Sequence, residues 1–196
     1  MSNSSKPRVT RRHKPKRKFT ENTYRKAKPF LLADFERRCA YSLQHVDKVG
    51  WMIIEIDHHN PTLKGVSRNR YENLFPATRH CNGSKAYTWP SRAGRQQGIR
   101  FLNPCEEQDY GLYIFEDPNT HELVGTTPAA VYHIRVLGLN APFLVNERRA
   151  RAALWHLLDE TPVKVRDTNL GQENIRELRR QLDLMIPRIP ALSRQK

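Results

Sequence analysis

Long apolar segments, paired cysteines and N-terminal acids are all scarce in this sequence of 196 residues. No apolar run approaches the roughly 20 residues that a membrane-spanning helix needs. The first 20 residues contain basic side chains but no apolar segment of the kind found in secretory signals. We therefore expect a cytoplasmic protein that does not act in a membrane.

The three cysteines, Cys39, Cys81 and Cys105, are an odd and widely spaced set. Such a set does not form the disulfide framework of a small secreted domain. No CxxC pair is intact in the chain. The fold must therefore be stabilised by its apolar core, and 196 residues suffice for one core with an appendage.

Acids are rare in residues 1–28, where Glu21 is the single acid among eleven lysines and arginines. This segment carries about +10 of the formal charge of +14. We expect residues 1–20 to form a disordered basic arm, because they cannot bury enough apolar surface to fold alone. The charge suits nucleic acid, and a solubilising tail without a specific role is the alternative. The arm residues expected to contact nucleic acid are Arg11, Arg12, Lys14, Lys16, Arg17 and Lys18.

The remaining pattern predicts an α+β fold. A helix is expected from Pro29 to about residue 39, a strand over residues 51–56 and a second short strand near residues 73–75. A short helix should follow from Asn82 to Tyr87. We assign residues 21–95 to a core domain with its preceding helix.

Beyond residue 95 the pattern predicts a hairpin with strands at 110–115 and 122–125. Thr127 and Pro128 are typical of a helix start, and Asn146 could cap a longer helix over residues 147–158. The hairpin and these helices make up residues 96–160. Residues 161–196 are expected to be a linker and an amphipathic helix at about 172–186, whose apolar stripe would pack in the core or bind another protein.

The stretch EIDHHNP, residues 55–61, places Asp57 and His58 at the end of the first expected strand. Asn73 and Asn82 follow on the second strand and the helix, so a ββα unit would bring these polar groups together. Histidine can take a proton from water near neutral pH. Carboxylate and amide oxygens suit Mg²⁺, which keeps several waters. Lys85 would lie where a phosphate passes.

These residues resemble the motifs of the HNH endonucleases, which have the ββα-metal fold. The first motif is matched by residues 55–61, the middle motif by Asn73-Leu74, and the last by residues 81–85, with Asn82 replacing the final histidine. The resemblance implies that His58 is the general base, that Asn73 orients it, and that Asp57 and Asn82 bind Mg²⁺ or Mn²⁺.

Other roles in the motif follow less directly. Some relatives add a metal-binding histidine where this chain has Ala86, so at most two protein ligands are expected. His59 has no assigned role and is taken as a phosphate or loop contact. Arg79 and Lys64 are further expected contacts to nucleic acid.

Many relatives also bind a structural zinc through two CxxC pairs. The corresponding segments here are residues 39–42 and 78–81, and each keeps one cysteine. Zinc normally needs four nitrogen or sulfur ligands. We expect no structural zinc and apolar packing in its place, with His45 or His80 as the residues that could restore a site.

Residues 99–158 are similar in spacing to the region after the HNH core in the nuclease subunit of Septu-type and retron-associated anti-phage systems. That resemblance implies an SMC-like ATPase partner and a role in antiviral defence. Together the patterns predict a metal-dependent endonuclease that hydrolyses DNA. One such site cuts one strand, so a double-strand break would need a dimer, a second visit or a paired complex, and an oligomer is therefore possible. The alternatives to the nuclease are a non-catalytic nucleic-acid-binding module and a protein-interaction subunit that keeps the fold.

Overall fold

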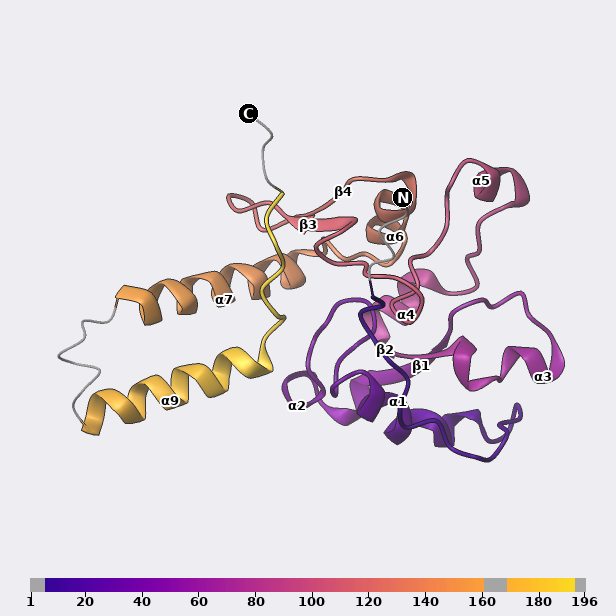
Figure 1. Ribbon diagram of the computed structural model, residues 1–196, viewed down its shortest axis with the longest axis horizontal. Coiled ribbons are helices and arrows are strands. Elements are labelled where there is room, and N and C mark those ends of the chain that lie inside the picture. Colours follow the sequence, from indigo (N-terminus) through magenta and orange to yellow (C-terminus); the bar gives the residue numbers. More distant parts are fainter. Residues whose placement is uncertain (1–5, 161–168, 193–196) are drawn as a thin grey trace.

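The chain forms an α+β fold with two small antiparallel sheets, as the sequence predicts (Figure 1). The computed structural model describes residues 6–160 and 169–192. Strand β1 (Ile54–His58) pairs with β2 (Leu74–Thr78), and β3 (Ile114–Glu116) pairs with β4 (Leu123–Gly125). The helical elements are η1 (Tyr24–Ala27), α1 (Lys28–Asp34), α2 (Val46–Val49), η2 (Trp51–Ile53), α3 (Gly65–Arg68), η3 (Tyr71–Asn73), α4 (Arg79–Lys85), α5 (Arg92–Gln96), α6 (Pro128–Val136), α7 (Pro142–Glu160) and α9 (Asn169–Leu184). Among the described residues, no helix combines the length and apolar content needed to cross a bilayer.

The sheet of β1 and β2 continues directly into helix α4. The strands are in antiparallel register from Ile54 opposite Thr78 to His58 opposite Leu74. The Thr78 hydroxyl accepts a hydrogen bond from the backbone N–H of Cys81 and so caps α4. The helix therefore begins three residues before the expected start at Asn82. It packs against both strands, so β1, β2 and α4 form one compact unit.

Two expected boundaries in this unit are shifted for local reasons. Residues Trp51–Ile53, expected as strand, form η2 and are partly exposed, with Met52 76% exposed. The first helix ends at Asp34 because Glu36 and Arg37 adopt positive φ values of 51° and 58°, which break a right-handed helix.

The N-terminal arm is ordered from residue 6, in contrast to the disorder expected for residues 1–20. The indigo segment in Figure 1 crosses the domain and buries Val9 and Phe19. Arg8 Nε donates to the fully buried Asp109 at 2.6 Å, and two backbone N–H groups of the arm donate to Asp34 at 2.8 and 2.7 Å. The arm folds because partners distant in the sequence supply the carboxylates and apolar surface that it lacks.

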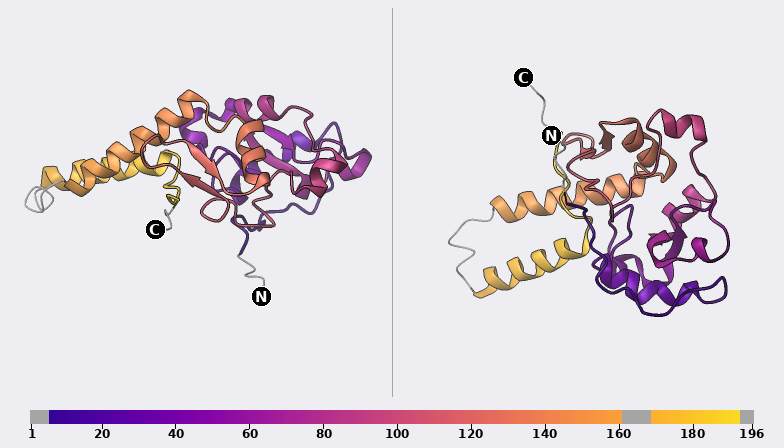
Figure 2. Two further views of the ribbon diagram at one scale, coloured as in Figure 1. Left: turned by 90° about the horizontal axis from the view of Figure 1, so that it is seen from above. Right: turned by 45° about the vertical axis from the view of Figure 1, so that its right-hand side comes forward.

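Helices α7 and α9 lie side by side and extend away from the rest of the protein (Figures 1 and 2). Leu158 of α7 packs with Leu182 of α9 and with Met185. The apolar stripe expected on the last helix therefore packs inside this helical pair. Helix α7 begins at Pro142, so Asn146 is not its cap. The expected linker at 161–168 lies outside the described residues.

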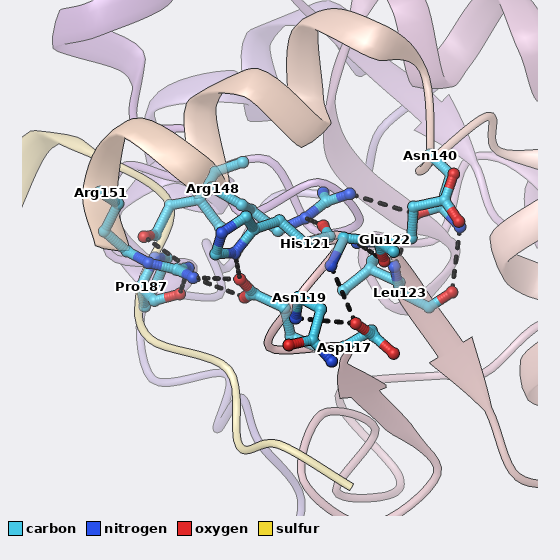
Figure 3. Close-up of polar contacts among 12 residues, drawn as sticks. Asp117, Asn119, His121, Glu122, Leu123, Asn140, Arg148, Arg151 and Pro187 are labelled. Carbon is cyan, nitrogen blue, oxygen red and sulfur yellow. Dashed lines mark hydrogen bonds and ion pairs between the residues drawn. The ribbon is translucent and has the colours of Figure 1, made fainter. Parts of the chain in front are cut away.

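Two buried arginines fasten α7 to the β3–β4 hairpin (Figure 3). Arg148 Nε donates to the backbone oxygen of His121 at 2.6 Å. Arg151 Nη2 donates to both oxygens of Glu116 at 2.7 and 2.5 Å, and its Nη1 donates to the backbone oxygen of Pro187 at 2.6 Å. The hairpin, the long helix and the chain after α9 are thus joined by one network.

Candidate active site at the end of strand β1

The side chains of β1 alternate between two surroundings, as in any strand. Glu55 and Asp57 face α4, where Glu55 meets Asn82 and Asp57 meets Lys85. The two acids are two residues apart on β1, and their partners are three residues apart on α4, so the two pairs lie next to each other between the strand and the helix. We call these two pairs the seam. The ring of His58, the next residue on β1, is bonded to neither α4 residue and meets Asn69 instead.

A chain of hydrogen bonds holds the His58 imidazole. His58 Nε2 lies 2.9 Å from Asn69 Oδ1, and Asn69 Nδ2 donates to Glu21 Oε2 at 3.1 Å. Because the amide nitrogen of Asn69 is turned toward a carboxylate, its oxygen must be the acceptor facing His58. Nε2 therefore carries the proton, and Nδ1 is the basic nitrogen.

The environment of His58 favours the neutral imidazole. Burial lowers its pKa below the ordinary value, while the hydrogen bond to Asn69 acts in the opposite direction. Among the described residues, no hydrogen bond engages Nδ1. His58 lines a cleft of about 220 Å³ together with Asn82, Arg68 and Tyr87. A neutral imidazole with one fixed tautomer at a cleft wall is suited to accept a proton from water.

Asn73 acts on the loop around His58 and not on its ring. Its Oδ1 accepts from the backbone N–H of Asn60 at 2.8 Å, and its Nδ2 donates to the backbone oxygen of Arg68 at 2.8 Å. Its backbone oxygen accepts from His59 at 2.8 Å. Asn73 thus holds the backbone of His59 and Asn60, which follow His58, and that of Arg68, which precedes Asn69. The expectation that Asn73 orients the ring directly is corrected: Asn69 does so.

Asp57 is buried in an ion pair, with 3% of the residue exposed. Lys85 Nζ donates to Asp57 Oδ1 at 2.8 Å and to the backbone oxygen of His58 at 2.8 Å. Tyr41 Oη donates to Asp57 Oδ2 at 2.5 Å. Burial lowers the pKa of Lys85, and Asp57 opposes that shift. Lys85 is fully buried, so it cannot contact a passing phosphate as expected.

Asn82 and Glu55 form the accessible part of the seam. Asn82 Nδ2 donates to Glu55 Oε2 at 2.7 Å, and Arg79 Nε donates to Glu55 Oε1 at 3.0 Å. The hydrogen bond from Asn82, with the one from Arg79, lowers the pKa of Glu55 although burial opposes it. Asn82 lines both the cleft at His58 and an adjoining cleft of about 370 Å³ that also contains Glu55.

Asp57 and Asn82 do not fit a Mg²⁺ or Mn²⁺ ion in this arrangement. Both carboxylate oxygens of Asp57 are hydrogen-bonded, and the Lys85 ammonium takes the place of a cation beside it. Within the described ranges, no group of three or more His, Cys, Asp or Glu side chains is arranged to hold a metal ion. The assignment of Asp57 and Asn82 as metal ligands stays a prediction.

His59 is a core residue, which corrects its expected role as a phosphate or loop contact. Its ring packs against Phe75, Trp89 and Phe101, with ring centroids 4.8, 5.8 and 6.3 Å away. Burial lowers its pKa to about 3. The neighbouring histidines of the motif are therefore not equivalent: His58 lines a cleft and His59 fills the core.

The basic residues of the arm divide into structural and exposed groups. The Arg11 guanidinium lies 4.9 Å from the Tyr71 ring and 4.8 Å from the Phe75 ring, and Nη2 donates to the backbone oxygen of Leu74 at 2.9 Å. Arg11 is thus a structural residue. The residues that remain exposed and available for nucleic acid are Arg12, Lys14, Lys16, Arg17, Lys18, Lys64 and Arg79. Four of them line a cleft of about 450 Å³ that includes Asn69, the partner of His58: Lys14, Lys16, Arg17 and Lys18.

The residues at the expected zinc positions form a buried polar cluster. Cys39 Sγ accepts hydrogen bonds from the backbone N–H groups of Tyr41, Ser42 and Thr78 at 3.3–3.4 Å. Cys39 and Cys81 also belong to the main hydrophobic core, so the apolar packing expected there is present and the hydrogen bonds to Cys39 add to it. His80 Nε2 lies 2.9 Å from the backbone oxygen of Gly138, and the other candidate histidine caps α2, so neither joins the cysteines.

Two residues of the His58 chain were not singled out by the sequence. Asn69 lies in a loop with many polar residues and has no distinguishing pattern. Glu21 had a signal, because it is the single acid among the first 28 residues. An isolated carboxylate in a basic segment indicates a specific partner, which here is Asn69 together with Arg68.

Comparisons with models of known protein families, with curated protein sequences and with solved structures find no match to this chain.

Proposed function

We propose that this chain is an endonuclease of the HNH kind that hydrolyses phosphodiester bonds in DNA. The observation that carries the proposal is His58, a neutral imidazole held in one tautomer by Asn69 and placed on a cleft wall. A ββα unit formed by β1, β2 and α4 surrounds it, in the order expected of the ββα-metal core.

His58 Nδ1 would take a proton from a water molecule as the water oxygen attacks phosphorus. The phosphorus–oxygen bond to the 3′ position breaks, which leaves a 5′-phosphate and a 3′-hydroxyl that takes a proton from solvent. The Nε2–H group donates to Asn69 throughout, so the ring does not rotate as its charge develops. The Glu21 carboxylate, which accepts a hydrogen bond from Asn69, favours the positive charge that the His58 ring gains. Arg68, which lines the same cleft as His58, lies where it can bind phosphate.

A non-catalytic nucleic-acid-binding module is the second candidate. The burial of Asp57 by Lys85 favours it, because an expected metal ligand is already engaged. The basic surface of the arm would serve either function. An SMC-like ATPase partner, a role in anti-phage defence and a cytoplasmic location remain predictions from the sequence.

Incubation of the purified protein with supercoiled plasmid separates the two candidates. The resemblance implies Mg²⁺ or Mn²⁺, so the assay includes each ion and an EDTA control. We expect conversion of the plasmid to nicked circles, because one site cuts one strand at a time. The EDTA control shows whether a metal ion is needed. Binding of the plasmid without conversion under any of these conditions contradicts the nuclease and supports the binding module.

A further inference from the structure

An exposed aromatic side chain stands at the edge of the cleft that contains His58. Tyr87 lines this cleft and is 81% exposed, so its ring contributes little to packing. It follows Ala86, whose φ of 45° is a left-handed conformation that residues other than glycine adopt at a cost. Strain of this kind tends to occur at functional sites. Here it turns the chain at the end of α4 and directs Tyr87 outward beside His58.

A second exposed aromatic ring lies near the other end of β1. Trp51 is 45% exposed and belongs to η2, immediately before the strand. Lys28 Nζ lies 4.4 Å from the Trp51 ring centroid and donates to its backbone oxygen at 2.5 Å. Lys28 lines the cleft that contains Glu55, and that cleft shares Asn82 with the cleft at His58. We name these two adjoining clefts together the β1 cleft.

Positive charge accompanies the aromatic rings. Arg25 and Lys28 line one half of the β1 cleft, and Arg68 lines the other. Tyr24 lines both halves, with the Arg25 guanidinium 4.9 Å from its ring and the His58 ring 4.8 Å away. Aromatic rings interleaved with cations along a groove are suited to a nucleic-acid strand whose bases are free to stack. A paired duplex hides those base faces unless a base step is opened.

We propose that the β1 cleft binds an unpaired stretch of nucleic acid, with bases stacked on Tyr87 and Trp51 and the intervening phosphate at His58. This rests on the proposed function, because it takes His58 as the point of hydrolysis. It narrows the substrate to DNA that is single-stranded or locally unpaired.

Fluorescence anisotropy with labelled DNA tests the proposal in EDTA, where binding is measured apart from cleavage. The probes are an oligothymidylate, a duplex of the same length and that duplex with an unpaired bulge. We expect the oligothymidylate to bind more tightly than the duplex. Tyr87→Ala should weaken oligothymidylate binding about tenfold, Tyr87→Phe should retain it, and duplex binding should not change. Phe143→Ala, which removes a half-exposed ring on α7, is the matched control.

Equal wild-type affinity for the oligothymidylate and the duplex would overturn the proposal. So would unchanged oligothymidylate binding by Tyr87→Ala, because the exposed ring would then have no part in binding the strand. Tight binding of the bulged duplex would identify locally opened DNA as the source of the unpaired strand. If Tyr87→Ala loses binding but the wild type cleaves no DNA, only the nuclease function fails. If the wild type cleaves and Tyr87→Ala binds normally, only this inference fails.

Discussion

Replacing Lys85 with methionine should lower the free energy of unfolding by about 3–5 kcal/mol, because it leaves a buried carboxylate without its partner. Lys85 is fully buried and Asp57 is 3% exposed, so water cannot replace the lost ammonium. The backbone oxygen of His58 also loses its donor. Urea unfolding of the wild type and the variant measures the difference.

Two further variants make this result specific. Lys64→Met removes an exposed lysine and should change the stability by less than about 0.5 kcal/mol. Combining Lys85→Met with Asp57→Asn removes both charges and should recover part of the loss. A Lys85→Met variant as stable as the wild type but weaker in DNA binding would instead support the phosphate-contact role predicted from the sequence.

Acid should destabilise the protein strongly between pH 7 and pH 5. Burial lowers the pKa of both His59 and His133 to about 3 in the folded state. In the unfolded chain both pKa values return to about 6.5, so the unfolded state binds two more protons over this range. Stability therefore falls as the pH drops below about 6.5, by roughly 2.7 kcal/mol per pH unit for the pair. The total loss from pH 7 to pH 5 is about 4 kcal/mol.

Urea unfolding at several pH values measures this slope. His59→Leu should reduce the slope of stability against pH by half, because it removes one of the two buried histidines. Leucine suits this position because His59 packs among aromatic rings and its Nδ1 has no hydrogen-bond partner in the described structure. His133 differs, since its Nδ1 accepts from the backbone N–H of Leu102 at 3.1 Å. A wild-type slope close to zero between pH 6.5 and pH 5 would mean that both imidazoles can be protonated in the folded protein.

Local patterns in the sequence were sufficient for some of the secondary structure. A hairpin is present, although its first strand is Ile114–Glu116 and not 110–115, and the capped start of α6 at Thr127 is confirmed. The short helices α2, α3 and α5 were not predicted. The hairpin and the start of α6 depend on turn and capping residues next to them in the chain. By contrast, the early end of the first helix depends on positive φ values at Glu36 and Arg37, which no local rule for those residue types predicts.

Burial of charge was the main feature that the sequence could not reveal. Lys85 is a surface residue by composition, and only its packing over β1 brings it to Asp57, 28 positions away. The same holds for Arg8, whose partner Asp109 lies 101 positions away. A count of charges per segment treats such residues as solvated, which is why the N-terminal arm was expected to be disordered.

At the candidate site, the motif indicated His58 as the proposed general base but did not indicate the residues that hold its ring. His58 was selected by its position after Asp57 at a strand end, and the structure places both residues at the wall of one cleft with Asn82. The orienting role expected of Asn73 belongs to Asn69, four residues earlier. A loop residue and an acid in the arm become neighbours only when the chain folds, so spacing alone could not indicate them.

The rate of DNA nicking by His58→Ala tests the role of His58 most directly. With equal protein and metal concentrations, we expect the initial rate on supercoiled plasmid to fall by at least about a hundredfold, the usual effect of losing a general base. His156→Ala, which removes an exposed histidine on α7, should nick at the wild-type rate. Circular dichroism spectra and urea unfolding should show that all three proteins are folded, so that a lower rate reflects the loss of the imidazole. Equal nicking by His58→Ala and the wild type would contradict the assignment of His58 as the base.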